Sequence, residues 1–488
     1  MVTSKIRYIN NLLNKKEISC TELTNKYLEK IQEENKNLNA YVKVTEEEAL
    51  IVAKKVDEKI SSKGHLMPLE GIPMTLKDNI STKNIETTCC SKILKGYVPI
   101  YDATVWETLK SQNAVLLGKS NMDEFAMGSS CETSCFGGAL NPHNLKHVAG
   151  GSSGGVSSAV GGNIAVYGLG SDTGGSIRQP ASFCGLVGLK PTYGAVSRYG
   201  LIAYASSFDQ IGPIAHTVED AAIIHDTISL YDKKDATSCA NKGIMTADKL
   251  NDSIKGKKIG IAKEYFEGIR DDVKESILQA IKIYEDLGAE IIYFELPELK
   301  YSLSVYYILA CAEASSNLGR YDGIRYGYKA SHYNDLNEMI CKTRSEGFGK
   351  EVKRRILLGT YVLSAGYYDA YYKKAQKLRG TLVRAFKNAF TKCDVILAPT
   401  VPMTAFELNF TSIDPVETYL TDICTVPVNI AGLPAVSIPC GFDSNGLPIG
   451  MQIIGNSFEE HKILNIAYQY EKQVGDKIYK NIELGVKL

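Results

Sequence analysis

Two serines, each set among glycines, are the residues of this sequence best suited to nucleophilic chemistry. The stretch at 150–155 reads GGSSGG and holds Ser152, and the stretch at 168–178 reads GLGSDTGGSIR and holds Ser176. A serine hydroxyl attacks only beside a base that takes its proton and beside donors that stabilise the resulting oxyanion. These stretches therefore raise three alternatives: a serine hydrolase elbow, a phosphate loop and an oxyanion hole.

The first alternative is the nucleophile elbow of serine hydrolases. Residues 150–154 match its G-x-S-x-G pattern, with Ser152 as the nucleophile. An elbow requires a strand directly before the serine, whereas residues 141–150 are polar, contain Pro142 and have a poor strand pattern. A triad would also need a histidine, and the downstream histidines lie in uninformative contexts. The sequence disfavours the elbow.

Phosphate binding is disfavoured as well. Residues 168–173 begin like a dinucleotide-binding loop, but Thr173 stands where the third glycine belongs, and no G-K-[ST] closes a loop of Walker length. Composition shows no basic footprint for nucleic acid either, because lysine plus arginine and aspartate plus glutamate both number 55.

The third alternative is an oxyanion hole beside Ser176. Thr173, Gly174 and Gly175 precede this serine, and such small residues let consecutive backbone N–H groups converge on one carbonyl oxygen. This arrangement favours Ser176 as a nucleophile for acyl transfer.

A base for this chemistry is offered by Lys77, which sits among apolar residues in GIPMTLKDN. Burial lowers the pKa of a lysine, and reaching about 7 from about 10.4 requires roughly 4 kcal/mol. The residues alone leave two possibilities open. Lys77 is either this base or one half of a buried ion pair with Asp78 or another acid.

Twelve scattered cysteines are typical of free thiols in a reducing cytoplasm. Cys131 and Cys135 have the spacing of half a zinc site, but no second pair completes four ligands, so we expect no metal. The sequence shows neither a secretion signal nor an apolar run of membrane-spanning length. We expect a soluble, cytoplasmic protein.

Apolar periodicity indicates the elements that must position these residues. Residues 3–60 look helical, with Ser19 and Glu22 as a capping box. Short apolar runs predict strands at 114–118, 164–169, 258–262, 291–294, 394–398, 435–440 and 449–454. Helical periodicity predicts helices over 272–287 and 458–474 and an almost wholly helical, tyrosine-rich stretch over 299–390.

Strands separated by helices indicate an α/β fold, with a large mixed, mostly parallel sheet, helices on both faces and a helical lobe. We expect one large domain in four segments: an N-terminal helical segment packed on the core (1–65), the core with the catalytic loops (66–298), the helical lobe (299–390) and a C-terminal return to the core sheet (391–488).

Taken together, the motifs resemble those of the amidase signature family. GGSSGG followed by GSDTGGSIRQPA has both serines and the Arg-x-Pro ending, GIPMTLKDNI is similar to the family's lysine segment, and FCGLVGLKPTYG at 183–194 is also family-like. The resemblance implies the amidase-signature fold and a Ser-Ser-Lys amide hydrolase. It implies Ser176 as nucleophile, Ser152 as the bridging serine and Lys77 as the base.

The resemblance also implies how the substrate is held. Backbone N–H groups from Thr173 to Ser176, including those of Gly174 and Gly175, would hold the oxyanion. Segments at 198–213, 312–327, 351–372 and 421–441 are similar to glutamine-hydrolysing subunits of amidotransferases that act on Glu-tRNA(Gln). In such a protein the glutamine-binding residues would be Arg355 for the α-carboxylate, Asp422 for the α-amino group, and Tyr307, Gly128 and Ser129 lining the pocket.

Two arginines of this segment keep alternative interpretations. Arg354 and Arg355 are adjacent, and the residues alone also permit a solvated helix face shared with Glu351. Arg354 stays an alternative clamp for the carboxylate. Arg178 is expected to anchor the signature loop by hydrogen bonds.

The same resemblance implies partners. This chain would release ammonia within a heterotrimer that also contains the amidotransferase B and C subunits, of which the B subunit holds most of the tRNA. It would need no cofactor of its own, and ATP and Mg²⁺ would be used by one of the partners. Two alternatives stay open: a stand-alone amidase of the same fold, and Asp-tRNA(Asn) as a second substrate of the complex.

Overall fold

The computed structural model describes residues 3–240, 245–410 and 419–478. Parts of the expected first and last segments, at residues 1–2, 411–418 and 479–488, therefore lie outside the described chain. The four-segment division stays a prediction.

The N-terminal segment is helical except for one short strand. Helices α1 (Lys5–Asn14), α2 (Cys20–Leu38) and α3 (Glu46–Ser61) form as expected, and Ser19 caps α2 by accepting from the N–H of Glu22 at 3.0 Å. Strand β1 (Tyr41–Val44) interrupts them and pairs with β3. The helical prediction missed β1 because four residues are too few to show alternation.

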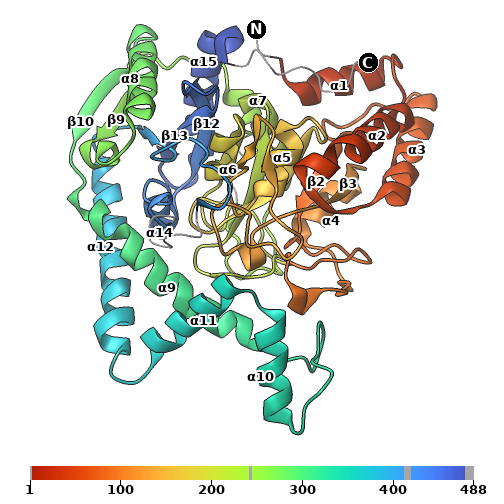
Figure 1. Ribbon diagram of the computed structural model, residues 1–488. Helices are drawn as coiled ribbons and strands as arrows, with labels where there is room; N and C mark the ends of the chain where they lie inside the picture. The colour runs from red at the N-terminus through yellow and green to blue at the C-terminus, as the bar shows by residue number, and fades with distance from the viewer. Residues whose placement is uncertain (1–2, 241–244, 411–418, 479–488) are drawn as a thin grey trace.

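One eleven-stranded sheet forms the centre of the molecule (Figure 1). Its strands run in the order β1-β3-β2-β6-β8-β7-β12-β13-β11-β9-β10. Beyond β1, their bounds are β2 Pro73–Lys77, β3 Val115–Ser120, β6 Tyr167–Asp172, β7 Val187–Lys190, β8 Gln210–Ala215, β9 Lys258–Ala262, β10 Glu290–Phe294, β11 Val395–Pro399, β12 Ala435–Phe442 and β13 Pro448–Gly455.

The expected α/β fold with a large mixed sheet is confirmed. Parallel pairing occurs in the two flanks, where β3, β2 and β6 run together and β11, β9 and β10 run together. Between these flanks the neighbours from β6 to β11 are antiparallel. Parallel pairing is therefore a property of the flanks and not of the centre.

Helices cover both faces of the sheet because successive side chains of a buried strand point to opposite sides. Strand β11 shows this directly. Val395 and Leu397 pack in one apolar cluster with residues of α8 and α15, whereas Ile396 and Ala398 pack in another with residues of α9, α12 and α14. Outside the helical lobe, the other α-helices of the described residues are α4 Thr104–Ser111, α5 Gly154–Gly161, α6 Arg178–Phe183, α7 Val218–Ile228, α8 Asp271–Asp286, α14 Val426–Ala431 and α15 Glu460–Ile478.

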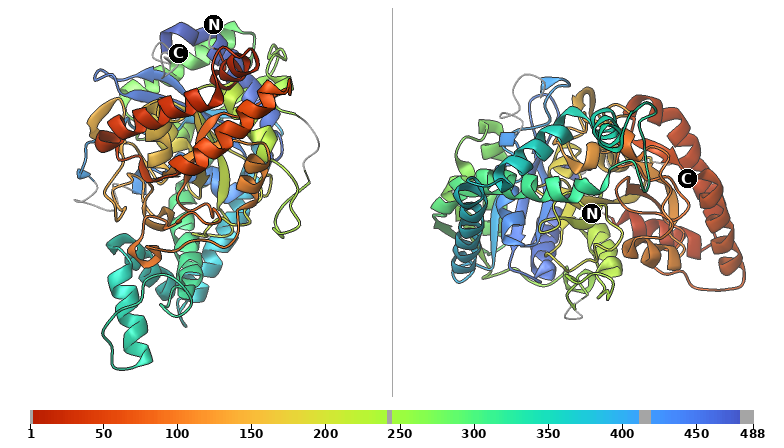
Figure 2. Two further views of the ribbon diagram at one scale, coloured as in Figure 1. Left: turned by 90° about the vertical axis from the view of Figure 1, so that its right-hand side faces the viewer. Right: turned by 90° about the horizontal axis from the view of Figure 1, so that it is seen from below.

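The helical lobe consists of α9 (Ser302–Asn317), α10 (Leu336–Gly347), α11 (Lys350–Leu363) and α12 (Lys374–Ala389). It lies at one end of the molecule, and α10 extends furthest from the body (Figures 1 and 2). Gly359 lets α11 approach α9, because a Cβ there would lie 1.9 Å from the carbonyl oxygen of Cys311. This close approach brings residues of α11 beside residues of α9.

The strand predictions succeed where apolar runs are short and bounded. The strand at 258–262 has the predicted bounds, and those at 394–398, 435–440 and 449–454 are right to within two residues at each end. The strand predicted at 164–169 instead starts at Tyr167 and continues to Asp172, into the glycine-rich stretch. No helix in the described part of the chain is long and apolar enough to cross a membrane.

Candidate active site

Lys77 is the last residue of β2, at the centre of the parallel flank formed with β3 and β6. Its side chain is fully buried. The ammonium nitrogen Nζ donates to Ser152 Oγ at 2.7 Å, to Ser153 Oγ at 2.9 Å and to the Ser171 carbonyl at 3.2 Å. All three N–H directions of Lys77 therefore meet neutral oxygens.

The alternative of a Lys77–Asp78 ion pair is wrong. The Asp78 carboxylate instead faces the buried amine of Lys119, at 3.7 Å, and accepts from Thr88. Burial lowers the pKa of Lys77 to about 8, and the more distant carboxylates of Asp123 and Asp172 only partly oppose this. A substantial fraction of Lys77 is therefore neutral near pH 7–8, as a general base requires.

The loop around Ser152 is packed against a buried acid. The peptide bond between Gly151 and Ser152 is cis, and a Cβ on Gly151 would lie 2.0 Å from Asp123 Oδ2. Glycine is thus required where the backbone passes the Asp123 carboxylate. Contrary to the sequence argument, a strand does precede this loop: β5 (Asn144–Val148), which pairs with β4 (Leu140–Asn141) in a separate small sheet.

Ser176 lies beside the Ser152 loop. Its carbonyl oxygen accepts from the N–H of Ser153 at 3.2 Å, and 8% of the residue is exposed, whereas Ser152 is fully buried. Within the described chain, the Ser176 hydroxyl makes no hydrogen bond to protein. The structure thus shows the Lys77–Ser152 contact, whereas among the described residues the hydroxyls of Ser152 and Ser176 do not contact each other.

The expected oxyanion loop follows β6. Among the described residues, the N–H groups of Thr173, Gly174 and Ser176 have no protein acceptor, whereas that of Gly175 donates to Asp172 Oδ1 at 2.8 Å. Gly175 therefore differs from the expectation, because its N–H is already engaged. The loop keeps three of its four expected donors open.

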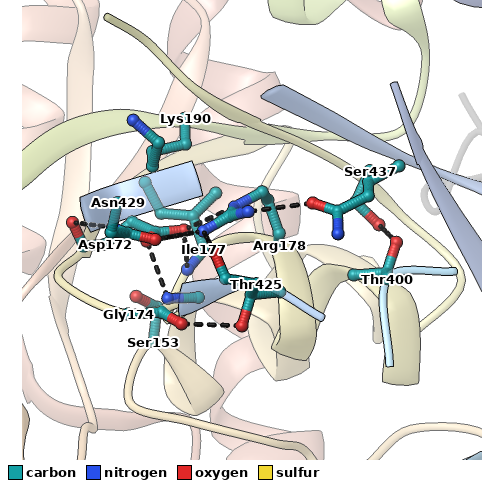
Figure 3. Close-up of polar contacts among 12 residues, drawn as sticks. Ser153, Asp172, Gly174, Ile177, Arg178, Lys190, Thr400, Thr425, Asn429 and Ser437 are labelled. Atoms are coloured by element: carbon teal, nitrogen blue, oxygen red, sulfur yellow. Dashed lines mark hydrogen bonds and ion pairs between the residues drawn. The ribbon is translucent and has the colours of Figure 1, made fainter. Parts of the chain in front are cut away.

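The Asp172 carboxylate holds this loop in place through hydrogen bonds (Figure 3). This carboxylate accepts from the N–H groups of Gly175 and Ile177, from Asn429 and from the guanidinium of Arg178. Burial raises the pKa of Asp172, but the charge and hydrogen bonds of Arg178, together with the charge of Lys190 and the hydrogen bond from Asn429, outweigh burial and hold the pKa at about 2. The carboxylate is therefore ionised at every relevant pH.

Arg178 anchors the signature loop, as the sequence suggested. The residue is fully buried, and it donates to Gln452 at 2.9 Å, to the Thr425 carbonyl at 3.2 Å and to Asn429 in addition to Asp172. These partners lie on β13, on α14 and directly before α14, more than 240 residues away. The loop that carries Ser176 is thus held by the C-terminal part of the sheet.

Arg355 and Arg354 have different environments although they are adjacent on α11. The side chain of Arg355 is 4% exposed and that of Arg354 is 34% exposed, and both pair with Glu351. Arg355 Nε donates to Glu351 at 2.8 Å and Nη1 to the Tyr204 hydroxyl at 2.6 Å. Its Nη2 has no protein acceptor among the described residues, which leaves an open site for an anion.

Three tyrosine rings surround this guanidinium. The rings of Tyr204, Tyr307 and Tyr419 have their centroids 5.2–5.6 Å from its central carbon. Such rings exclude water and attract the cation through their faces. The solvated-face interpretation is therefore wrong for Arg355 and fits only Arg354.

Asp422 lies beside the same tyrosines and is partly buried. Its carboxylate accepts from Tyr307 at 2.9 Å and from Ser129 at 3.3 Å, and no lysine or arginine within the described chain reaches salt-bridge distance. Burial raises the pKa of Asp422 to about 7, which the Tyr307 hydroxyl and the charge of Arg355 only partly oppose. A cationic ligand would relieve this desolvation.

The structure thus brings Ser129, Tyr307, Arg355 and Asp422 together. Gly128 has a different neighbour, because a Cβ on it would lie 2.3 Å from Asp123 Oδ1. Sequence reasoning missed Tyr204 and Tyr419, whereas it had placed Glu351 beside Arg354 and Arg355. No periodic signal marks the two tyrosines, because they come from separate segments that only the tertiary fold unites.

The chain is similar to known proteins along almost its whole length. The sequence model of the family described as Amidase matches residues 22–464. The glutamyl-tRNA(Gln) amidotransferase A subunit of Thermoanaerobacter pseudethanolicus is 56% identical over 468 residues, which cover 96% of each chain. The protein of the same name from Carboxydothermus hydrogenoformans is 54% identical, over 95% of this chain and 96% of that one.

Solved structures agree with these relatives. The crystal structure of the glutamyl-tRNA(Gln) amidotransferase A subunit from Thermotoga maritima has a TM-score of 0.79 and 41% identity, covering 96% of this chain and 93% of that chain. The native peptide amidase of Stenotrophomonas maltophilia has a TM-score of 0.78 and 28% identity, with 95% and 96% covered. The resemblance found in the motifs is confirmed.

The dependence of the loop on Asp172 yields a first prediction. Asp172→Asn leaves Arg178 buried without its counter-charge, which costs on the order of 3–5 kcal/mol. We expect a clear fall in Tm and faster amide hydrogen exchange in a peptide covering 173–178.

Asp272→Asn is the matched control, because Asp272 pairs with Arg270 at the surface, where both side chains are at least 30% exposed. That change should cost less than about 1 kcal/mol. Equal Tm values for the two variants would show that the Asp172 pair does not hold the loop.

Proposed function

This chain belongs to the amidase family, and on that premise we propose that it hydrolyses glutamine as the A subunit of a glutamyl-tRNA(Gln) amidotransferase. The observation that supports glutamine over other amides is a pair of opposite charges, buried Arg355 and partly buried Asp422, each with a side left open. A free α-amino acid presents the matching carboxylate and ammonium. An amide without these groups would leave both charges unmatched.

The reaction begins with proton transfer through the two serines. Neutral Lys77 accepts the proton of Ser152, with which it already shares a 2.7 Å contact, while Ser152 takes the proton of Ser176. Ser176 Oγ then forms a bond to the side-chain amide carbon of glutamine. The carbonyl oxygen becomes an oxyanion facing the open N–H groups of Thr173, Gly174 and Ser176, each worth about 3 kcal/mol in such a site.

Collapse of this intermediate breaks the C–N bond. The proton returns through Ser152 to the leaving nitrogen, which departs as ammonia and leaves a glutamyl ester on Ser176. Water, activated through the same Lys77–Ser152 contact, attacks the ester and releases glutamate. Each proton taken by Lys77 is thus given back within the cycle, so the chain needs no cofactor.

In the proposed complex, the partner proteins use this ammonia. We place this chain in a heterotrimer with the B and C subunits of the amidotransferase. In this assembly the B subunit binds most of the tRNA, and one of the partners uses ATP and Mg²⁺ to activate Glu-tRNA(Gln). The relatives are named as A subunits, which supports a multi-subunit assembly. Free thiols at all described cysteines support the cytoplasm as the compartment.

A stand-alone amidase is the second candidate, since a peptide amidase shares the fold. It would elute as an active monomer and accept acetamide but not glutamine. The proposed amidotransferase component co-elutes with two co-expressed partners and prefers glutamine.

The two adjacent arginines give a direct test of glutamine recognition. Arg355→Ala removes hydrogen bonds to a charged group, worth about 1.5–3 kcal/mol, and should raise the KM for glutamine about 10- to 150-fold. Arg354→Ala is the matched control, because it removes the other partner of Glu351 and its side chain is 34% exposed, whereas that of Arg355 is 4% exposed. Its KM should stay within about threefold of wild type.

Steady-state ammonia release from glutamine is the measurement. A larger increase in KM from Arg354→Ala than from Arg355→Ala would show that Arg354, and not Arg355, binds the α-carboxylate. An enzyme that hydrolyses acetamide faster than glutamine would refute the proposed function itself.

The pH dependence of kcat/KM follows from two groups with shifted pKa values, Lys77 and Asp422. Lys77, with its pKa lowered to about 8, must be neutral, so activity falls as pH drops below that value. Asp422, with its pKa raised to about 7, must be ionised to bind the ammonium, so binding falls below pH 7. Both losses act in the same direction, and log kcat/KM should fall with a slope approaching about two on the acid side.

Ammonia release measured from about pH 5 to about pH 9 tests this dependence. Asp422→Asn should raise KM and leave a one-proton slope set by Lys77 alone. A profile that stays flat between about pH 6 and about pH 8 would contradict the role of both groups.

A further inference from the structure

Thr425 lies between the two halves of the active site. It is fully buried, three residues after Asp422, and immediately precedes α14. Its Oγ1 lies 2.6 Å from the carbonyl oxygen of Gly174 and 3.1 Å from that of Asp422. A hydroxyl has one proton, so the shorter contact makes Gly174 its main acceptor.

This contact fixes one side of the Gly174–Gly175 peptide (Figure 3). The carbonyl accepts from Thr425, and the N–H on the opposite side donates to Asp172 at 2.8 Å. Because a peptide group is planar, two contacts on opposite sides determine its rotation. The two adjoining peptide groups carry the N–H groups of Gly174 and Ser176, which the proposed reaction assigns to the oxyanion, so this rotation constrains their directions.

The packing leaves this arrangement little freedom. A Cβ on Gly175 would lie 2.3 Å from Thr425 Oγ1, and Gly175 has a φ of +139°, which favours glycine. A Cβ on Gly174 would lie 2.6 Å from the ring of Tyr306, on the other side of the loop. A displacement of Thr425 therefore moves the oxyanion loop with it.

The other end of this connection is the ammonium site. The N–H of Thr425 donates to the Asp422 carbonyl at 3.0 Å, so the Asp422–Thr425 turn moves as one unit. The Asp422 side chain, in turn, is held by Tyr307 and Ser129 and lacks a cationic partner in the described chain. An ammonium bound there supplies the missing charge and fixes the turn.

We infer that Thr425 is a positioning residue that couples occupation of the ammonium site to the geometry of the oxyanion hole. This inference rests on the proposed function and deepens it, because it assigns the route by which the α-amino group of the substrate contributes to kcat and not only to binding. Binding energy from a remote group is then used at the reacting centre. Amides that lack an α-amino group bind without completing the oxyanion hole.

The experiment compares two substrates, glutamine and glutaramate, which is glutamine without its α-amino group. Thr425→Val replaces the hydroxyl by a methyl group of similar size. We expect kcat for glutamine to fall about 10²-fold, since small misplacement of catalytic groups has effects of that size, while KM changes less than about threefold. The kcat for glutaramate, already low in the wild type, should change less than about threefold, so the ratio between the substrates collapses.

Thr425→Ser keeps the hydroxyl and is the rescue control. Its ratio of kcat for glutamine to kcat for glutaramate should stay near that of wild type. If Thr425→Val does not fold, Thr425→Ala removes the same hydroxyl with a smaller side chain. Equal losses on both substrates would reduce Thr425 to a structural role and overturn the inference, as would a wild-type ratio in Thr425→Val. A wild-type enzyme that fails to hydrolyse glutamine would instead refute the proposed function.

Discussion

The buried ion pair between Asp172 and Arg178 determines the geometry on which the rest of the active site depends. Both side chains are fully excluded from water. Such a pair is costly unless every remaining donor and acceptor is satisfied. Here Asp172 also accepts from the N–H groups of Gly175 and Ile177, on either side of Ser176, so the cost of burial is offset by contacts that orient the nucleophile.

Two other ionisable groups, buried Lys77 and partly buried Asp422, lack such an opposite charge at salt-bridge distance within the described chain. Lys77 meets only neutral oxygens, and Asp422 meets only hydroxyls at hydrogen-bond distance. Burial therefore shifts both pKa values toward neutrality, which makes Lys77 a competent base and Asp422 a site that favours a cation. The Asp172–Arg178 network is fully paired, which makes the loop that carries Ser176 rigid. Lys77 and Asp422 are incompletely paired, which leaves Lys77 able to react and Asp422 able to bind a cation.

The sequence was most informative where chemistry depends on contiguous residues. The positions of Ser152, Ser176, Lys77 and the anchoring Arg178 could be located from short motifs, because a glycine-rich loop and an apolar lysine segment are local features, whereas the roles proposed for the two serines and Lys77 came from the family resemblance. The strand before the Ser152 loop was missed, since β5 is polar and belongs to a two-stranded sheet with no buried face to impose alternation.

The substrate side was harder to predict, because its residues are far apart in the chain. Arg354 and Arg355 are indistinguishable in a KRR run, and only the packing of α11 on α9 decides which one faces the tyrosines. The contacts of Tyr204, Tyr419 and Thr425 depend on how separate segments meet, and no propensity or spacing encodes them. The engaged N–H of Gly175 likewise follows from a side chain and not from the glycine itself.

The two serines divide the labour of the proposed reaction, in which Ser176 attacks and Ser152 relays the proton. Mass spectrometry of the enzyme, stopped with acid during glutamine turnover, tests this division most directly. We expect a glutamyl ester on the peptide containing Ser176, and its absence in Ser176→Ala, while Ser152→Ala forms the ester slowly on the same residue. A glutamyl ester on Ser152 in the wild-type enzyme would contradict this division of labour.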